Sequence, residues 1–397
     1  MSDLASGIPL PSPVQPFRYR RLGQQVFVGG VLPVDAVGTL IGADDIEAQT
    51  HAVFRNLQAA LAAAGLQMAD LVRLNTYYVY EGEEAQATVF WEKMTRVRLL
   101  YFPDPGPAAT AVRVQGTGVR GALIQLEAEA LAVPALQRQR IMPEKSWDWS
   151  IPVPLSQGWR AGSQVWVGGQ VSADRAGKAI NLGDLPGQTR NVLEHIRHVL
   201  LDAGAQFSDL TQLKVCYLHD GDDEAAEARL QEILGVVRTT CGEPLPPVTA
   251  FGVNLLYEGL LLEIDATAQV EVRHPQATAE GGNRNWTAGV QVQRAGSIIQ
   301  VAGQSVAAQG FEQACSEVLQ RLVALLRAVG AGPGALAHLH VLVAADDAPE
   351  RAMALFTRAL HMCCGEDLPP FTLVRVNGLP GGAPLQVDAI AVEARPA

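Results

Sequence analysis

Along the first third of the chain, segments whose hydrophobic residues recur at helical spacing alternate with segments in which every second residue is hydrophobic, as in strands. Between residues 45 and 64, Val53, Leu57 and Leu61 recur at helical spacing, and Gly65 stands where a helix C-cap belongs. Between residues 71 and 80 the apolar positions alternate with period two, as in a half-buried strand. The pattern predicts, in order, two extended segments around Gly23 within 18–34, a helix at 45–64, a strand at 71–80, a helix at 83–99, and strands at 110–114 and 123–132.

The stretch from Val26 to Val114 returns 139 residues later without a gap. The segment Val26-Phe-Val-Gly-Gly30 returns as Val165-Trp-Val-Gly-Gly169, and the register still holds at the threonines Thr110 and Thr249. Such self-similarity at a fixed period sets the architecture of a chain. The second copy predicts strands at 164–168, 213–218, 249–254 and 260–269, and helices at 186–203 and 223–239.

A third and shorter copy begins at Ile299-Gln-Val-Ala-Gly303. It predicts helices at 311–329 and 348–361 and closing strands at 372–377 and 385–392. Linkers at 134–154 and 275–285 divide the chain into repeats at 1–136, 137–275 and 276–397. The fold class expected is therefore α+β, with three tandem repeats that each hold a mixed sheet and two helices.

Composition and charge narrow the function classes. The 397 residues are 48% hydrophobic and 18% charged, with no apolar run long enough to cross a bilayer, so we expect no membrane partner. A net charge of −11 argues against a nucleic-acid partner on electrostatic grounds. Five cysteines without Cys-x-x-Cys spacing indicate neither a disulfide framework nor a zinc site. The first residues lack the basic and apolar regions of a secretory signal, so we expect a short tail and a cytoplasmic protein.

The order of motifs resembles the RidA (YjgF-type) family of reactive-intermediate imine deaminases, whose repeat unit is chorismate-mutase-like. The resemblance covers nearly the whole chain three times over and depends on several short segments taken in order. These are Gly29-Gly30, Gly169-Gln170, Gly303-Gln304, Ala63-Ala-Gly65, Asp70-Leu-Val72 and the endings Leu126-Glu-Ala-Glu-Ala130, Ile264-Asp-Ala266 and Val387-Asp-Ala-Ile-Ala391.

Members of that family are homotrimers with a site in each cleft between subunits. The resemblance therefore implies an intramolecular pseudo-trimer with three non-identical clefts and leaves further self-association open. It implies a small-molecule substrate and no cofactor, since hydration of an imine needs only a placed water and a proton shuttle. It also implies that Gly30, Gly169 with Gln170, and Gly303 with Gln304 contact substrate.

In the family, a carboxylate on the last strand positions the water that attacks the imine carbon. We expect the matching catalytic residues to be Glu129, Asp265 and Asp388, one in each copy. A carboxylate suits this task because it can take a proton from water and return it to the leaving amine. The alternative is that these acids are solvated or paired surface residues.

The family's second mark, an arginine that clamps the substrate carboxylate, is absent. The matching positions hold Ala109, Val248 and Phe371. Four residues further along the same strand face stand Arg113 and Arg375, which are candidates for substrate binding from the rim of a cleft. The alternative for both is a salt bridge between repeats. Phe371 in place of the clamp indicates a more apolar or aromatic substrate.

Four other features resemble motifs of other sites. The glycines from Gly116 to Gly121 match a dinucleotide pattern but open no helix, so we expect a hairpin turn. The pairs His195/His198 and His338/His340 lack further ligands in sequence, so no metal is expected. The pair Cys363-Cys364 is expected to be structural. No Ser-Lys pair recurs across the copies, which disfavours the three-repeat ring hydrolases that open cyanuric acid and barbiturate.

The leading hypothesis is a hydrolase or deaminase acting on an imine, enamine or related C–N bond of a small metabolite, with Glu129 as the first choice of catalytic residue. The alternative hypothesis is a non-catalytic protein with the same pseudo-trimeric fold that binds a small molecule or a partner. Loss of the arginine favours this alternative, and an acid in every copy favours the hydrolase. The negative net charge of the chain argues against a ribonuclease role, because it repels the phosphate backbone of RNA.

Overall fold

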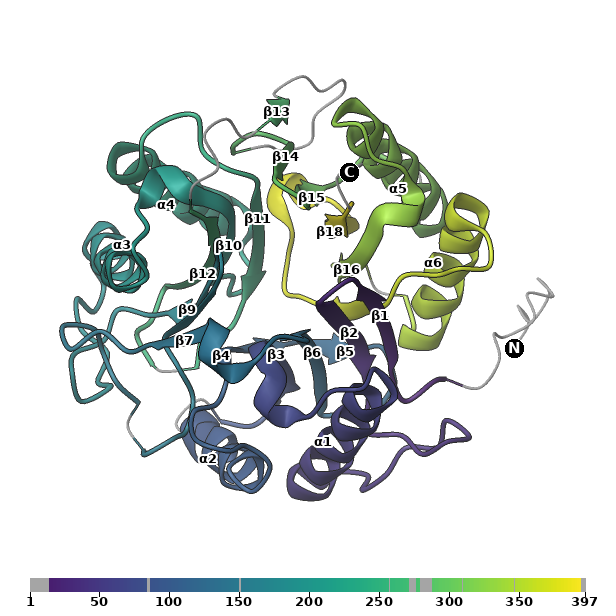
Figure 1. The fold of residues 1–397 in the computed structure, drawn as a ribbon, viewed down its shortest axis with the longest axis horizontal. Helices are drawn as coiled ribbons and strands as arrows, with labels where there is room; N and C mark the ends of the chain where they lie inside the picture. The colour runs from purple at the N-terminus through teal and green to yellow at the C-terminus, as the bar shows by residue number, and fades with distance from the viewer. Residues whose placement is uncertain are drawn as a thin grey trace.

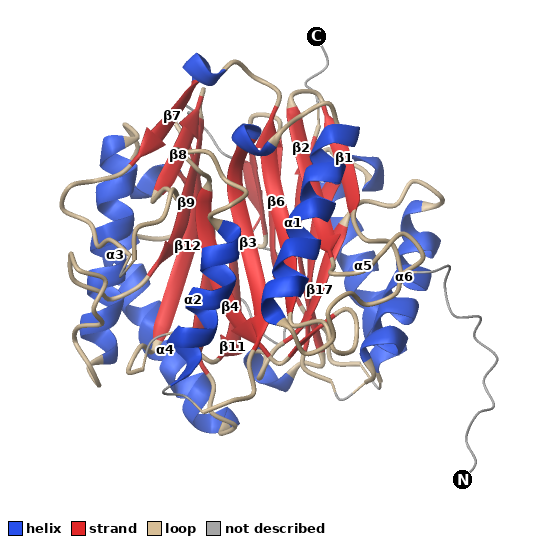
Figure 2. Cartoon of the chain, turned by 90° about the horizontal axis from the view of Figure 1, so that it is seen from below, coloured by secondary structure: helices blue, strands red, loops and turns tan. Residues whose placement is uncertain are grey.

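The computed structural model describes residues 14–83, 86–149, 151–256, 258–270, 276–278, 288–308, 310–345 and 347–393. Three units, each with a mixed sheet and two helices, surround a common axis with the sheets inside and the helices outside (Figure 1). The α+β fold class is confirmed. The side view shows the strands running along the axis with helices flanking them (Figure 2).

The elements follow the predicted order in every unit. In the first they are β1 Arg18–Leu22, β2 Gln25–Val31, α1 Ile46–Ala63, β3 Leu71–Val79, α2 Ala87–Arg98, β4 Ala108–Val114, β5 Gly116–Thr117 and β6 Ile124–Leu131. In the second they are β7 Arg138–Ile141, β8 Gly158–Ala161, β9 Gln164–Gln170, α3 Leu185–Asp202, β10 Leu210–Leu218, α4 Asp223–Cys241, β11 Val248–Val253 and β12 Leu262–Gln269.

The third unit has β13 Gln276–Thr278, β14 Val292–Ala295, β15 Ile298–Gln304, α5 Phe311–Ala328, β16 Leu336–Val343, α6 Pro349–Cys364, β17 Phe371–Arg375 and β18 Leu385–Val392. A short 3-10 turn precedes the middle strand of each unit, at Met68–Asp70, Phe207–Asp209 and Pro333–Ala335.

Local sequence signals begin and end the first helix of each of the first two units. The Asp45 carboxylate accepts hydrogen bonds from the amides of the first turn of α1, and Asp184 does the same for α3. Gly65 and Gly204 follow these helices with φ of 76° and 69°, a left-handed conformation that favours glycine. The helix end predicted at Gly65 is therefore confirmed, and Gly204 is its counterpart in the second unit.

Each unit has the same strand connections. The middle strand (β3, β10 or β16) pairs antiparallel with the last strand (β6, β12 or β18) and parallel with the strand that follows the second helix (β4, β11 or β17). One face of each sheet packs its apolar side chains against the two helices, and these three cores carry most of the buried hydrophobic residues. The opposite face looks toward the common axis, so any polar residue on it comes close to the other two units.

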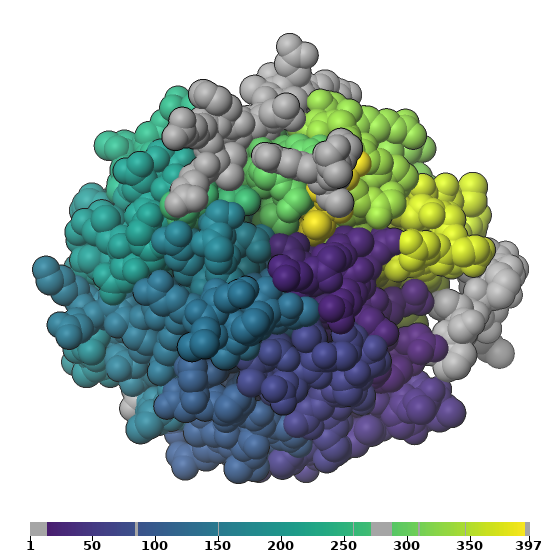
Figure 3. Space-filling view, in the orientation of Figure 1, coloured from purple at the N-terminus to yellow at the C-terminus, as the bar shows by residue number. Residues whose placement is uncertain are grey.

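Neighbouring units are joined along their sheet edges. β4 of the first unit lies against β9 of the second, and β5 pairs with β17 of the third, with Thr117 opposite Val374. A further apolar cluster at these junctions takes residues from all three units, including Tyr77, Phe251 and Val374. In the space-filling view the three units meet at the centre of the face (Figure 3).

Three expectations need correction. The glycine segment from Gly116 to Gly121 is not a hairpin turn, because β3 lies between β4 and β6 and the segment contributes β5 to the third sheet. Helix α2 begins at Ala87 rather than at residue 83. The linker expected at 134–154 also contains β7, which extends the second sheet.

The exact repeat boundaries stay a prediction. The N-terminal tail at 1–13 lies outside the described residues, as does the linker at 275–285 apart from β13. Within the described residues, we find no helix that combines the length and apolar character needed to span a bilayer.

Candidate functional site

The junctions between units are built from equivalent residues. At the junction of units 1 and 2, the amide of Gly169 donates a hydrogen bond of 3.0 Å to Thr110 Oγ1. At the junction of units 3 and 1, the amide of Gly30 donates to Thr372 Oγ1 at 3.1 Å. These two predicted glycines therefore lie at the clefts, each beside a strand of the neighbouring unit.

The residue that faces each glycine comes from the last strand of the same unit. Strand register makes these residues equivalent, since Gln125 pairs with Tyr77, Glu263 with Cys216 and Gln386 with Leu342. Only the second unit has an acid at this position. The clefts thus differ at this position, where a carboxyl group could exchange a proton with a substrate and a glutamine could not.

A pocket of about 430 Å³ lies in the cleft between units 1 and 2. Glu263 and Gly169 line it, and it extends between the two sheets under the segment that links the units. Its other lining residues are mostly aromatic or apolar, as in many small-molecule sites. They are Trp91, Arg98, Ala109, Ala111, Trp147, Trp149, Leu155, Val171 and Leu256.

The carboxyl group of Glu263 has an unusual environment. Burial, with a smaller contribution from the nearby Asp265 carboxylate, raises the pKa of Glu263 to about 8. Among the described residues, no hydrogen bond or ion pair ties down its side chain. A carboxyl group in this state is protonated at neutral pH and can both donate and accept a proton near that pH.

Arg98 brings a positive charge to the same pocket. Its side chain is buried, its Nη2 donates a hydrogen bond of 3.1 Å to Thr95 Oγ1, and its Cζ lies 5.7 Å from the centre of the Trp91 ring. Ala109, which occupies the position of the missing family arginine, lines this pocket too. A guanidinium group is therefore present in the cleft, although it comes from helix α2 and not from strand β4.

Gln170 acts on the pocket indirectly. Its Oε1 accepts a hydrogen bond of 3.0 Å from Trp147 Nε1, and its Nε2 donates to Gln157 Oε1 at 2.7 Å. Gln157 Nε2 in turn donates to the carbonyl oxygen of Trp147. This closed set of hydrogen bonds holds Trp147 over the cleft, 5.1 Å from Trp149 between ring centres.

The equivalent positions in the other two clefts are engaged by backbone groups. Gln125 Oε1 accepts a hydrogen bond of 3.1 Å from the amide of Gly118, and Gln386 Nε2 donates to the carbonyl oxygen of Ala250 at 2.8 Å.

The carbonyl oxygen of Phe371 lies against Gly30, 2.8 Å from where a β-carbon would stand. Gln304 is buried and donates to the carbonyl oxygen of Ala302 within its own strand, and Gly303 lies against the side chain of Gln386.

The three acids predicted from sequence lie elsewhere. Asp265 pairs with Lys214 and Asp388 with His340, whereas Glu129 pairs with Arg73. The residue equivalent to Asp265 and Asp388 is Glu127, which pairs with Asn75. The predicted equivalence of Glu129 was therefore wrong by two positions, because a shift of two residues keeps the side chain on the same strand face.

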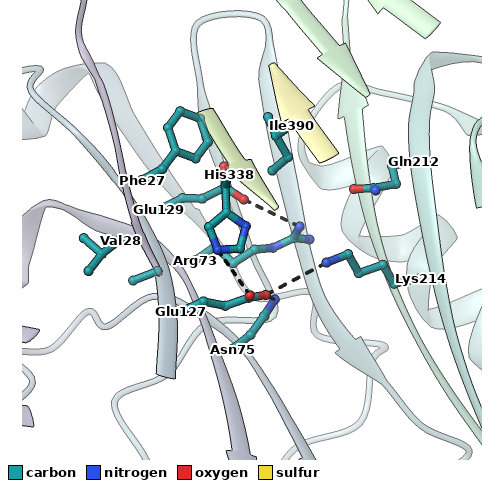
Figure 4. Close-up of a pocket in the computed structure, with 11 residues that line it drawn as sticks. Phe27, Val28, Arg73, Asn75, Glu127, Glu129, Gln212, Lys214, His338 and Ile390 are labelled. Carbon is teal, nitrogen blue, oxygen red and sulfur yellow. Dashed lines mark hydrogen bonds and ion pairs between the residues drawn. The ribbon is translucent and has the colours of Figure 1, made fainter. Parts of the chain in front are cut away.

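These acids are also not distributed one to a cleft. They gather around the common axis, where Arg73 Nη2 lies 3.5 Å from Asp265 Oδ1 and Lys214 Nζ lies 3.6 Å from Asp388 Oδ1. Arg73 also lies 3.8 Å from Glu129. We refer to the pocket of about 340 Å³ that Arg73, Asn75, Glu127, Glu129, Gln212, Lys214 and His338 line as the axial chamber (Figure 4).

The two predicted rim arginines do not line either pocket. Arg113 donates a hydrogen bond of 3.0 Å from Nε to the carbonyl oxygen of Tyr80, and its Cζ lies 5.1 Å from the centre of that ring. Arg375 ends β17, where it pairs with Gly116.

His195 is buried near Ser146 and the Ala173 carbonyl oxygen. Within the part of the chain that the structure describes, no group of three or more His, Cys, Asp or Glu side chains is arranged to hold a metal.

Sequence reasoning missed Glu263 and Arg98. The sequence does contain a signal for Glu263. The segment Leu262-Glu-Ile-Asp265 aligns with Ile124-Gln-Leu-Glu127, and at the second position of these segments the second copy has an acid where the first has Gln125. Arg98 has no such signal, because it approaches the cleft from a helix distant in sequence from both β9 and β12.

Comparisons with known proteins agree with the repeat. The family model described as Endoribonuclease L-PSP matches residues 11–133 and again residues 150–270. A RutC family protein of Pyrococcus horikoshii is 35% identical over 118 residues, which are 30% of this chain and 88% of that protein. The 3-aminoacrylate deaminase RutC of Acinetobacter baylyi is 30% identical over 138 residues, 34% of this chain and 100% of that protein. A crystal structure of a chorismatase is similar in fold, with a TM-score of 0.50 and 16% identity, covering 64% of this chain and 78% of that one.

Proposed function

The chain belongs to the Endoribonuclease L-PSP family, which includes the RidA (YjgF-type) proteins, and on this premise we propose that it hydrolyses an imine, enamine or related C–N bond of a small metabolite. The reaction takes place in the cleft between units 1 and 2. The observation that carries the proposal is the Glu263 carboxyl group, which is buried beside Gly169 with a pKa raised to about 8.

Glu263 supplies the proton transfers of the reaction. The protonated carboxyl group donates its proton to the imine nitrogen, and the carboxylate that remains takes a proton from the water that attacks the imine carbon. When the C–N bond of the resulting amino alcohol breaks, that proton passes to the nitrogen, which leaves as ammonia, and the hydroxyl proton of the amino alcohol returns to Glu263 as the carbonyl group forms. An enamine enters the same sequence after protonation at carbon gives the imine.

The other residues that line the pocket determine which class of substrate it can bind. Arg98 offers a positive charge for a carboxylate on the substrate, and Trp91, Trp147 and Trp149 offer apolar surface for a planar conjugated group. A relative of this chain is named a 3-aminoacrylate deaminase, and an aminoacrylate combines an enamine with a carboxylate. The name of this relative supports the proposal that the substrate of this chain carries both an enamine and a carboxylate.

Ammonia release from a panel of enzymatically generated imines and enamines, with and without a carboxylate, tests the proposal. Glu263→Gln should lower kcat by a factor of at least about 100, because proton transfer by a positioned side chain contributes about that much or more. The matched control is Glu129→Gln, the same change at the acid favoured by sequence reasoning, and it should retain turnover. Full activity of Glu263→Gln, or loss only in Glu129→Gln, would contradict the assignment.

A second candidate function is binding without catalysis. It is favoured by the glutamines Gln125 and Gln386, which replace the acid in two of the three clefts and bond to backbone groups there. If the wild-type protein releases no ammonia from any member of the panel, while a panel member raises its melting temperature, this second function replaces the first.

A further inference from the structure

The axial chamber is a second pocket, separate from the cleft that holds Glu263. Side chains from all three units line it: Arg73, Asn75, Glu127 and Glu129 from the first, Gln212 and Lys214 from the second, and His338 and Ile390 from the third. The side chains of Arg73, Glu127, Glu129, Lys214 and His338 converge on one space (Figure 4). It exists only because three sheets of one chain face each other.

The charged groups of the chamber stand apart rather than in direct contact. Lys214 Nζ lies 3.9 Å from Glu127 Oε1, Arg73 Nη1 lies 3.8 Å from Glu129 Oε1, and His338 Nε2 lies 3.5 Å from Glu127 Oε2. Hydrogen bonds between charged groups are typically shorter, near ~2.8 Å. Both signs of charge therefore face the same space, and each cation also lies near an aspartate outside the lining, Arg73 near Asp265 and Lys214 near Asp388.

Four buried polar atoms of the lining lack a hydrogen-bond partner among the described residues. Two are donors, Arg73 Nε and Gln212 Nε2, and two are acceptors, Asn75 Oδ1 and Glu127 Oε2. All four side chains are more than nine-tenths buried. Buried polar groups in native proteins are usually paired, so a set of two donors and two acceptors around one pocket points to a ligand that carries both kinds of group.

The charges decide the class of ligand. A simple anion would meet the carboxylates of Glu127 and Glu129, and a simple cation would meet Arg73 and Lys214. Burial lowers the pKa of His338 to about 4, so this imidazole is neutral at neutral pH. The two cations and the acids of the lining then favour a ligand whose own charges are separated and sum to zero.

A further pocket lies next to the axial chamber. It has a volume of about 300 Å³ and shares Phe27, Glu129 and Ile390 with the lining of the chamber. Trp166 Nε1 donates a hydrogen bond of 2.9 Å to Glu129 Oε2, which holds this carboxylate between the two pockets. Phe27 and Ile390 supply apolar surface on the same side, where the side chain of a ligand would lie (Figure 4).

We propose that the axial chamber binds a small zwitterion that carries an ammonium and a carboxylate group, the chemistry of a free amino acid with a small apolar side chain. Arg73 and Gln212 donate hydrogen bonds to the carboxylate. Glu127 and Asn75 accept hydrogen bonds from the ammonium group. The site is distinct from the proposed catalytic cleft and does not depend on the function proposed for it.

Isothermal titration calorimetry of the full chain at pH 7 tests the proposal with three probes of matched shape. L-valine carries both charged groups, isovalerate carries only the carboxylate, and isobutylamine carries only the amine. We expect L-valine to bind at one site per chain and each single-charge probe to bind at least tenfold more weakly. Equal binding of isovalerate or isobutylamine would overturn the zwitterion assignment, and no heat from any probe would overturn the site.

The variant Gln212→Met locates the ligand. Because Gln212 Nε2 has no partner in the described protein, its loss removes no intramolecular hydrogen bond, and the melting temperature without ligand should not fall. Binding of L-valine should weaken about fivefold to tenfold, as expected for one lost hydrogen bond. Gln231→Met on the exposed face of α4 is the matched control and should leave binding unchanged.

The variant Glu263→Gln separates this site from the catalytic cleft. It should retain L-valine binding even where turnover is lost. Binding that is insensitive to Gln212→Met but lost in Glu263→Gln would place the ligand in the cleft and overturn the axial site.

Discussion

Gly169 lies directly against the carboxylate of Glu263, so that a β-carbon at Gly169 would overlap Glu263 Oε1. The two residues come from β9 and β12 of the same sheet. Their contact sets the position of the acid in the cleft between units 1 and 2. This relationship explains why a glycine is required at a position that the sequence marked only as part of a repeated pair.

Gly169→Ala should displace Glu263 and reduce turnover at least tenfold. The added methyl group should cost less stability than overpacking of a rigid core site, because the atom that it meets most closely is the free end of the Glu263 side chain. Steady-state kinetics and urea denaturation measure the two effects. Gly235→Ala is the control, since nothing lies within 4 Å of a β-carbon there and the helix α4 should gain about 0.5–1 kcal/mol. Unchanged kinetics in Gly169→Ala would show that the contact does not position the acid.

The raised pKa of Glu263 predicts a specific dependence of stability on pH. An unfolded glutamate loses its proton near pH 4.5, whereas the folded protein keeps that proton up to about pH 8. Between these values the native state binds more protons than the unfolded state, so this group lowers stability as pH rises through that window. A tenfold difference in proton affinity between the two states corresponds to about 1.4 kcal/mol, so the full effect is on the order of several kcal/mol.

Glu263→Gln should therefore raise the melting temperature at pH 8 to 9 and leave it nearly unchanged at pH 4.5. Thermal denaturation of the variant and the wild type across this range measures the difference. The activity of the wild type should also change near pH 8, where the carboxyl group titrates. A difference in melting temperature that is constant with pH would show that the pKa of Glu263 is not raised.

Lys214 is the central cation of the buried network at the axis. Burial opposes its charge, but the carboxylates of Asp388 and Glu127 outweigh that cost and raise the pKa of Lys214. Lys214→Met should destabilise the protein by about 3–5 kcal/mol, because it leaves two buried carboxylates without their cation. Arg197→Met, which breaks the exposed pair with Glu194, should cost less than about 1 kcal/mol. Equal effects of the two changes in urea denaturation would contradict this account.

Gln170 should matter for substrate binding through Trp147. Gln170→Leu leaves Trp147 Nε1 and Gln157 Oε1 without their partner, at a cost of about 1–3 kcal/mol for each buried group. We expect altered tryptophan fluorescence and a KM raised several-fold with a smaller change in kcat. The matched control is Gln304→Leu in the third unit, where the glutamine donates to the carbonyl oxygen of Ala302 in its own strand and, among the described residues, bonds no residue of another unit. A kcat loss without a change in KM would mean that Trp147 does not contribute to binding.

Much of the fold followed from the sequence. The period of the hydrophobic residues located the α-helices of the described part of the chain, and the 139-residue repeat established that one unit recurs. Gly65 and Gly204 marked helix ends because a left-handed residue after a helix strongly favours glycine, which is a local requirement. Local backbone preferences and amphipathic periods are properties of short segments, so a single sequence can show them.

The site could not be predicted in the same way. Strand alternation puts Glu127 and Glu129 on one strand face, and Glu263 and Asp265 likewise, so the period of two cannot distinguish Glu129 from Glu127 or Asp265 from Glu263. Only the pairing of β12 with β10 and the approach of β4 to β9 decided which acid lies in a cleft and which lies at the axis.

The sequence by itself determined the repeated unit, its helices and its strand faces. The tertiary structure alone decided which units meet and which side chains share a pocket. Glu263 and Arg98 line one pocket, and Lys214 lies beside Asp388, although the members of each pair are far apart along the chain. Contacts between such distant residues leave no local pattern, because they form only when the three sheets pack around the common axis.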